Sequence, residues 1–263
     1  MKTNKPIPLD ALIIGGGIAG LWLLARLKAQ GWRVILCENK ALGYGQTIAS
    51  QGIIHGGTKY ALTGQASTAA QAIADMPKRW QQALQGQGAV DLSAVKWLTD
   101  HQLLWTSATV SAKITGFFAS KLMQSRMQSL PTEAYPNFFQ HKAFQGHLYQ
   151  LAEPVLDIPS LLQYFQQQFS ENLIHSQAIT LQATAYHAAP APAYQAVIHS
   201  GDQCFTVQPS RIFATAGEGN QALLAQLNDL SSHNLDFLTK TANNPPLMQR
   251  RPLQMLMAKG THL

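Results

Sequence analysis

Charged residues and cysteines are both scarce in this sequence, and each shortage excludes a class of protein. Charged residues make up 12% of the 263 positions, and 19 Lys and Arg against 13 Asp and Glu give a formal net charge of +6. The basic residues form no run and are not clustered with aromatics, so we expect no nucleic-acid partner. The excess favours an anionic small molecule only weakly.

Two cysteines, Cys37 and Cys204, are too few for a disulfide scaffold and lack the spacing of metal ligands. We expect both to be buried apolar side chains in a reducing compartment. The histidines also lack the i, i+4 spacing of a helical metal site, so we assign no residue to a metal.

Long apolar runs are missing as well. The stretch from Ala11 to Ala25 follows Lys2 and Lys5, as a secretory signal would, but Asp10 and four glycines argue against one. The stretch is also shorter than the roughly 20 apolar residues that a membrane helix needs. We therefore expect no membrane span and a soluble, cytoplasmic protein.

The N-terminal segment predicts a strand, a helix and a second strand. Residues 11–14 form a short apolar run, typical of a strand that is buried on both faces. From Ile18 to Gln30 apolar residues recur at helical spacing, and Gly31 stands where a C-cap glycine is expected. The run Val34–Cys37 predicts the second strand, which completes a βαβ unit.

The turn between the first strand and the helix has the glycine spacing of a dinucleotide-binding fingerprint. Gly15 permits the tight turn, Gly17 lets the backbone approach a pyrophosphate, and Gly20 lets the helix pack closely on the sheet. The helix begins at Ile18 and Ala19, and its free N–H groups suit phosphates without a basic side chain.

An acidic residue ends the second strand at the distance expected for ribose recognition. Glu38, followed by Asn39, would accept hydrogen bonds from the adenosine ribose and repel a 2′-phosphate. This disfavours NADP and leaves FAD or NAD.

The next segment favours FAD through a family resemblance. It contains Gln46-Thr47 and then Gly52-x-Ile54-His55-Gly56-Gly57, with Tyr60 behind them. This stretch resembles the flavin loop of the D-amino-acid-oxidase-like (DAO) superfamily of FAD-dependent oxidoreductases. It looks most like L-2-hydroxyglutarate oxidases and FAD-dependent glycerol-3-phosphate dehydrogenases, which overlap on His55. The resemblance implies FAD as cofactor and assigns to its binding Gln46, Thr47, Ser50, Gln51 and Gly52.

Later segments extend the resemblance along most of the chain. Glu153–Ser160 is similar to the start of the family's second FAD-domain helix. Ile212–Gly217 is similar to the strand that returns beneath the pyrophosphate, which implies that Ala216 and Gly217 contact the cofactor. A backbone stretch of the family contacts adenine, and Ala178–Ile179 is the matching pair, with Ile179 assigned to the cofactor.

The C-terminus departs from the family pattern. Family members usually continue past the strand that Pro252–Met257 resembles, with another glycine-rich turn that faces the flavin. This chain stops at Leu263. We therefore expect it to be incomplete at its C-terminus.

Few reactive residues are needed, because the flavin itself accepts the hydride. His55 is the candidate base, since a neutral imidazole can take a hydroxyl proton; it can equally hydrogen-bond the flavin ring or a carbonyl. Arg251 is the second catalytic candidate, as a guanidinium fork for a substrate carboxylate, with a solvated basic corner as the alternative. Lys59 and Tyr60 follow His55 closely enough to line the same pocket or to lie on the surface.

We predict an α/β protein with a Rossmann-like FAD-binding domain, built on a parallel sheet, and a second, β-rich substrate domain. The FAD-binding domain is assigned to 8–76 and 151–222, and the substrate domain to 77–150 and 223–263. Sequence patterns predict further helices at 67–84, with Pro77 as a kink or boundary, and at 159–169, and strands at 97–106, 172–175, 193–199 and 211–215.

The predicted function is FAD-dependent oxidation of a small CH–OH substrate, anionic and resembling a hydroxy acid. An amino-acid or other CH–NH oxidase of the same superfamily is the first alternative. A truncated, non-catalytic flavin-binding module is the second. The electron acceptor stays open among oxygen, a quinone and another protein.

Overall fold

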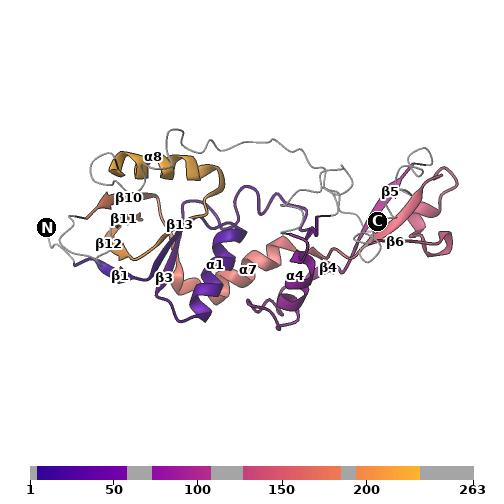
Figure 1. Cartoon of the computed structure of the whole chain (residues 1–263), viewed down its shortest axis with the longest axis horizontal. Helices are drawn as coiled ribbons and strands as arrows, with labels where there is room; N and C mark the ends of the chain where they lie inside the picture. The colour runs from indigo at the N-terminus through magenta and orange to yellow at the C-terminus, as the bar shows by residue number, and fades with distance from the viewer. Residues whose placement is uncertain (1–4, 58–72, 108–126, 185–193, 232–263) are drawn as a thin grey trace. The chain divides into compact units, whose positions relative to one another are not determined.

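The computed structural model describes residues 5–57, 73–107, 127–184 and 194–231, with side chains described up to Gln226 in the last segment. These residues form two compact units (Figure 1). Unit 1 contains the described residues up to Ala49 and those from Leu162 onward, and unit 2 contains those from Ser50 to Leu161. The predicted domains were defined by what they bind, FAD or substrate, whereas the two units are defined by their internal contacts. The predicted domain boundaries therefore stay a prediction.

Unit 1 begins with the predicted strand, helix and strand. They are β2 (Ala11–Ile14), α1 (Ile18–Ala29) and β3 (Val34–Glu38). Gly31 follows α1 with φ +79°, and its N–H donates to the Lys28 carbonyl, as expected of a C-cap glycine. The apolar spacing therefore predicted the correct element types and nearly the correct ends.

The central sheet of unit 1 is parallel, as predicted. Its order is β13-β2-β3-β9, where β9 is Leu173–His175 and β13 is Ile212–Ala214. Each neighbouring pair in this sheet is parallel. All four residues of β2 are buried, which explains their unbroken apolar run. The mixed α/β fold class is thus confirmed.

A second, antiparallel sheet covers one face of the parallel sheet. Its order is β1-β12-β11-β10, and β1 pairs with β12 in parallel. Of its three longer strands the sequence predicted only β11, near 193–199. β10 has a single fully buried position and β12 alternates only in its second half, so neither has a clear strand pattern. The bounds are β1 (Ile7–Leu9), β10 (Ala178–Ala183), β11 (Tyr194–Ser200) and β12 (Gln203–Pro209).

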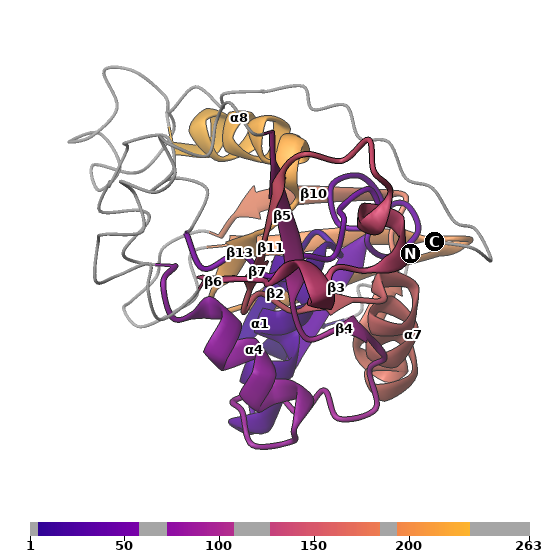
Figure 2. The same ribbon diagram turned by 90° about the vertical axis from the view of Figure 1, so that its right-hand side faces the viewer.

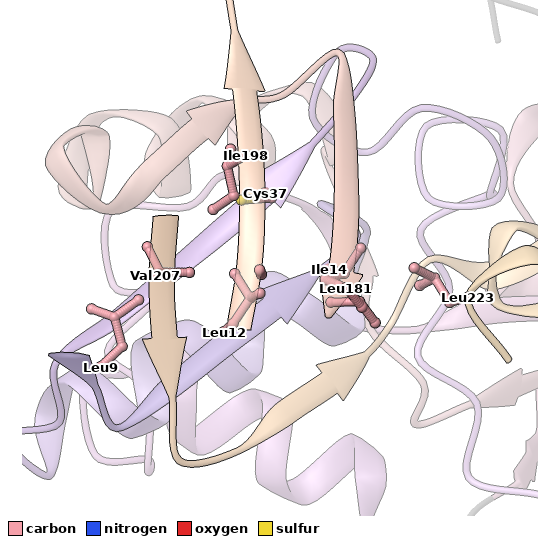
Figure 3. Close-up of a cluster of buried hydrophobic side chains, with 9 residues drawn as sticks. Leu9, Leu12, Ile14, Cys37, Leu181, Ile198, Val207 and Leu223 are labelled. Atoms are coloured by element: carbon pink, nitrogen blue, oxygen red, sulfur yellow. The ribbon is translucent and has the colours of Figure 1, made fainter. Parts of the chain in front are cut away.

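The core of unit 1 lies between its two sheets (Figure 3). Leu12 and Cys37 from the parallel sheet meet Ile198 and Val207 from the antiparallel sheet, and all four are at most 1% exposed. Full burial of each aliphatic side chain stabilises the fold by roughly 1.5 to 3 kcal/mol. This packing holds the carboxyl ends of β2 and β3 in a fixed position.

Helices complete unit 1. Figures 1 and 2 show α1 and α7 (Ile158–Gln168), which belongs to unit 1 from Leu162 onward, on the face of the parallel sheet that the antiparallel sheet leaves uncovered. The helix α8 (Asn220–Ser231) lies beside β10, where Gln226 Oε1 accepts a hydrogen bond from the Leu181 N–H at 3.3 Å. Short 3₁₀ turns occur at Ser170–Asn172 and Gly217–Gly219.

Unit 2 is mainly β structure in its described part. A three-stranded antiparallel sheet has the order β5-β7-β6, and a two-stranded sheet pairs β4 with β8. The helix predicted over 67–84 begins at Met76, because residues 73–75 form a turn, and residues 67–72 lie outside the described part. Pro77 lies in the first turn of α4 and so marks its start, one of the two roles predicted for it. The bounds are α4 (Met76–Leu84), β4 (Trp97–Thr99), β5 (Gln102–Thr106), β6 (Met127–Ser129), β7 (His147–Leu151) and β8 (Val155–Leu156), with 3₁₀ turns at Thr132–Ala134 and Asn137–Gln140.

Two further expectations need correction. The predicted strand at 97–106 is two strands, β4 and β5, which pair with different partners. Cys204 is exposed rather than buried, because the neighbouring Phe205 and Val207 alternate toward the core and leave Cys204 on the other side of the chain. Among the described residues, no helix is long and apolar enough to cross a membrane.

Candidate functional site

The glycine-rich turn of unit 1 follows β2 directly, and two of its glycines are required by the fold. Gly15 has φ +116°, and a Cβ there would lie 2.5 Å from the Cα of Ala216. At Gly20 a Cβ would lie 2.1 Å from the Gly15 carbonyl oxygen and 2.7 Å from Thr215 Oγ1. Neither position accepts a side chain, because the atoms met are backbone or close to it.

The fold does not require the glycine at position 17. Gly17 has an ordinary extended conformation, φ −74° and ψ 175°. The nearest atom that an added Cβ would meet is Thr47 Oγ1, at 3.4 Å. The space that a side chain would occupy therefore stays open at the N-terminus of α1. A dinucleotide pyrophosphate fits this turn, since it needs close approach to the backbone at that glycine.

The N-terminus of α1 lies at the glycine-rich turn, where the first N–H groups of a helix have no intrahelical partner. Gly17 is the N-cap residue and provides no side-chain cap. The Ile18 N–H donates to Thr47 Oγ1 at 3.0 Å, while Ala19 is exposed to solvent. Thr47 itself is 8% exposed. Two predicted cofactor residues from separate segments, Ile18 and Thr47, thus lie in contact, with Gln46 exposed beside Thr47.

Glu38 ends β3 next to the same turn. Its Oε2 accepts a hydrogen bond from the Gly16 N–H at 2.6 Å, and its Oε1 accepts from the N–H groups of Asn39 and Lys40, both at 2.9 Å. The carboxylate therefore stabilises the glycine-rich turn through hydrogen bonds to its backbone. Its predicted ribose contact stays a prediction.

A cavity of about 340 Å³ lies beside Glu38 at the carboxyl ends of β3 and β9. Its walls include Leu36, Lys40, Gln166 and His175. Ligands of open parallel sheets bind outside the carboxyl ends of the strands, so this cavity is placed where a nucleotide would enter. Its lining is half apolar and half polar or charged, so it offers a ligand both packing surface and hydrogen-bonding groups.

The residues that follow the returning strand β13 lie at the fingerprint, while the predicted cofactor contacts of Ala216 and Gly217 stay predictions. Thr215 Oγ1 donates to the Gly15 carbonyl oxygen at 2.9 Å, and Ala216 is the residue that excludes a side chain at Gly15. Gly217 follows with φ +57°. Ile179, by contrast, lies on β10 and packs against the core between the sheets, and its predicted adenine contact stays a prediction.

In unit 2, the segment after the flavin-type loop is anchored to β8. The Gly52 N–H lies 3.4 Å from Ser50 Oγ, and Gln51 between them is exposed. Gly52 has φ +73° and its carbonyl accepts a hydrogen bond from the Leu156 N–H at 3.0 Å. The Ile54 N–H then donates to the Pro154 carbonyl at 2.9 Å. These backbone pairs determine where the next residue, His55, lies.

His55 contacts a buried carboxylate that the sequence did not mark as functional. Its Nδ1 lies 3.0 Å from Glu153 Oε2, and the two side chains are 46% and 4% exposed. Glu153 Oε1 accepts from the Gly56 N–H at 2.9 Å, and Gln102 Nε2 donates to Oε2. When Nδ1 donates to the carboxylate, the neutral ring keeps Nε2 as its acceptor.

One sequence feature could have identified Glu153. It is the single acidic residue between Leu148 and Leu156, in a segment with many apolar residues. A carboxylate in such a segment is buried only when it is paired, so a partner was to be expected. The partner's identity depends on the pairing of distant segments.

Other predicted site residues lie outside the described part of the chain. They include Arg251, Lys59 and Tyr60. Within the described part, no three His, Cys, Asp or Glu side chains form a group that would hold a metal ion.

Comparison with known proteins identifies related sequences. A sequence model of the family described as FAD dependent oxidoreductase matches residues 10–173. The chain is 38% identical over 259 residues to the probable FAD-dependent oxidoreductase PA4991 of Pseudomonas aeruginosa, covering 98% of this chain and 60% of that protein. It is also 38% identical over 63 residues to one of the subunits of the anaerobic glycerol-3-phosphate dehydrogenase of Escherichia coli, which is 24% of this chain and 12% of that relative.

Solved structures with a similar fold agree with this relationship. The crystal structure of PA4991 superposes with a TM-score of 0.64 at 32% identity, covering 86% of this chain and 52% of that one. Glycine oxidase from Geobacillus kaustophilus superposes with a TM-score of 0.59 at 13% identity, covering 84% and 59%. The second similarity concerns the fold alone. The chain thus spans about 60% of the length of the curated relative that it matches throughout.

Proposed function

The chain belongs to the DAO family of FAD-dependent oxidoreductases, and from this premise we propose that it takes part in the oxidation of a small, anionic CH–OH substrate. FAD would supply the hydride acceptor. The observation that carries the reaction is the half-exposed His55 ring, whose Nδ1 is bound to Glu153 and whose Nε2 remains available. The open space beside Gly17 supports the assignment of FAD as the cofactor, because a pyrophosphate needs room at that position.

Residues of unit 1 would hold the dinucleotide part of FAD. The N–H groups at the start of α1 would bind the pyrophosphate, where Gly17 leaves room for it. Glu38 would accept hydrogen bonds from the ribose hydroxyls with lone pairs that its backbone partners leave free. The cofactor contacts that the family resemblance assigns to Ser50, Gln51 and Gly52 stay a prediction.

His55 would act as the general base. The proton of the substrate hydroxyl would pass to Nε2 while the proton on Nδ1 stays in its hydrogen bond to Glu153. A positioned base of this kind contributes roughly 10²- to 10⁴-fold to a rate. Arg251 would bind an anionic group of the substrate.

The CH–OH class is favoured over CH–NH by the need for a base. Amine oxidation requires less help from a base, because the amine lone pair assists departure of the hydride. The glycerol-3-phosphate dehydrogenase relative acts on an alcohol carbon by its name, which supports the same class. The chain's formal charge of +6 is compatible with an anionic substrate.

The test is anaerobic reduction of the bound flavin, with glycerol 3-phosphate, lactate and 2-hydroxyglutarate in one panel and amino acids in another. We expect reduction by a member of the first panel. His55→Asn should slow that reduction by about 10²- to 10⁴-fold with FAD still bound, because Asn keeps a donor near Glu153 but has no group at the Nε2 position.

His147→Asn is the matched control, since it makes the same change at an exposed position of unit 2. It should reduce at the wild-type rate. Reduction by amino acids alone would contradict the CH–OH proposal. A His55→Asn protein that reduces the flavin at the parental rate would remove His55 from the chemistry.

A further inference from the structure

The buried carboxylate of Glu153 links three segments of unit 2 that are distant in sequence. His55 and Gly56 belong to the loop that is anchored on β8, Glu153 follows β7, and Gln102 begins β5. Gln102 pairs with Leu151, the last residue of β7, and Glu153 follows Leu151 by two residues. This pairing brings the Gln102 side chain close to the Glu153 carboxylate. The sheet register therefore determines which groups meet the carboxylate.

Both oxygens of Glu153 are used as acceptors. Oε1 accepts from the Gly56 N–H, and Oε2 is shared between His55 Nδ1 and Gln102 Nε2. Three groups that converge on a carboxylate 4% exposed leave it little freedom to rotate. A group held in this way can orient a neighbouring ring.

We propose that Glu153 is a positioning residue that keeps His55 in the Nδ1–H tautomer, and that Gln102 holds Glu153 in the required orientation. Catalytic use of this tautomer rests on the proposed function, in which Nε2 takes the substrate proton. After that transfer both ring nitrogens carry protons, and the positive ring faces the negative carboxylate of Glu153. The pair therefore stabilises the charge that proton transfer creates.

Glu153→Gln tests the proposal with a side chain of nearly the same shape. The new amide can accept from the Gly56 N–H only by placing its NH₂ group toward His55, so Nδ1 must become an acceptor and the proton must move to Nε2. We expect nitrogen NMR of the FAD-loaded protein to show this reversal at His55. The signal is identified among the nine histidines by its loss in His55→Asn.

The kinetic expectation follows from the tautomer. Glu153→Gln should lower kcat for flavin reduction by about 10²- to 10⁴-fold with little change in KM, because the base is lost and not the substrate site. Glu153→Asp, which keeps a carboxylate, should retain the Nδ1–H tautomer and recover part of the rate. Gln102→Met should cost roughly tenfold in kcat, the effect of one lost hydrogen bond to a charged group.

Glu133→Gln is the matched control, because Glu133 is an exposed glutamate of the same unit. It should change neither the tautomer nor the rate. A wild-type His55 that carries its proton on Nε2 would overturn the proposal, and this measurement needs no variant. So would a folded Glu153→Gln protein with the wild-type tautomer and kcat.

The two proposals fail in different ways. If His55→Asn reduces flavin normally while Glu153→Gln reverses the tautomer, the base assignment is wrong and the positioning role of Glu153 stands. If His55→Asn is slow while Glu153→Gln alters neither measurement, the base assignment stands and the positioning role is wrong.

Discussion

Single residues in the glycine fingerprint have different physical roles. Gly15 and Gly20 are surrounded by protein atoms closer than any real Cβ approaches, so the fold itself excludes side chains there. Gly17 has open space next to it and an ordinary backbone conformation. The fold therefore does not require a glycine at position 17, where the proposed pyrophosphate contact would lie. It does require Gly20, because α1 packs closely on the turn there.

Alanine substitutions separate these roles. Gly17→Ala should leave the free energy of unfolding of the apoprotein within about 1 kcal/mol of wild type. It should raise the FAD dissociation constant at least about tenfold, because the methyl group occupies the pyrophosphate space. Gly20→Ala should cost about 3 kcal/mol of stability or more, since its Cβ would overlap a carbonyl oxygen.

Flavin titration and chemical unfolding of the apoprotein measure the two effects. A Gly17→Ala protein that binds FAD as tightly as wild type would place the pyrophosphate elsewhere. A Gly20→Ala protein of unchanged stability would contradict the packing role.

The two cysteines should differ in reactivity. Burial raises the pKa of the Cys37 thiol to about 12, whereas Cys204 is exposed. A raised thiol pKa keeps the protonated form, so at pH 8 the reactive thiolate of Cys37 is a fraction on the order of 10⁻⁴. A disulfide reagent at pH 8 should titrate one thiol quickly in the native protein and two after unfolding.

Cys204→Ser provides the control for this assignment. It should abolish the fast thiol and leave Cys37 to react only on unfolding or as the pH approaches its pKa. Two fast thiols in the native wild type would contradict the burial of Cys37 between the sheets.

At the scale of elements, the short strand β8 determines the position of the His55 loop. Gly52 and Ile54 on one side make backbone hydrogen bonds with Pro154 and Leu156 on the other. Because β8 has only two residues, few hydrogen bonds hold the loop against it, and the loss of one of them should displace the loop. Glycine at position 52 is required because φ is +73° and a Cβ would lie 2.3 Å from the Leu156 carbonyl oxygen.

Gly52→Ala should therefore disturb the loop as well as the strand. We expect a stability loss of about 3 kcal/mol or more, together with loss of the His55 tautomer signal. Gly201→Ala is the control, because Gly201 has φ +57° with no atom within 4 Å of an added Cβ. It should cost only about 1 to 2 kcal/mol, the penalty of a left-handed conformation. If chemical unfolding shows that Gly52→Ala and Gly201→Ala lose equal amounts of stability, the contact of the added methyl group with Leu156 has no effect.

Elements with strong periodicity were predicted well, and weakly patterned ones were not. The helix at Ile18–Ala29 and the strands on either side follow from apolar spacing alone. The strand Ala178–Ala183 escaped prediction because only Leu181 in it is fully buried. It pairs along its whole length with the neighbouring strand β11, a contact that the sequence of the segment alone does not reveal.

At the scale of the whole molecule, the fold of unit 1 is assembled from both ends of the described chain. The strand β13 pairs with β2, about two hundred residues earlier, and Thr215 hydrogen-bonds to Gly15. The fingerprint is therefore complete only when a late strand has joined the sheet. Unit 2 supplies His55, Glu153 and Gln102, which are likewise far apart in sequence.

The sequence by itself determined the βαβ unit, its fingerprint and the family. These depend on local backbone freedom, such as that of Gly15, and on spacing within about 30 residues, so a short segment contains the whole signal. Only the tertiary structure placed Glu153 against His55, 98 positions away, and left Cys204 exposed. Those outcomes depend on strand register and on which face of a sheet is covered, and both are fixed by distant segments packing together.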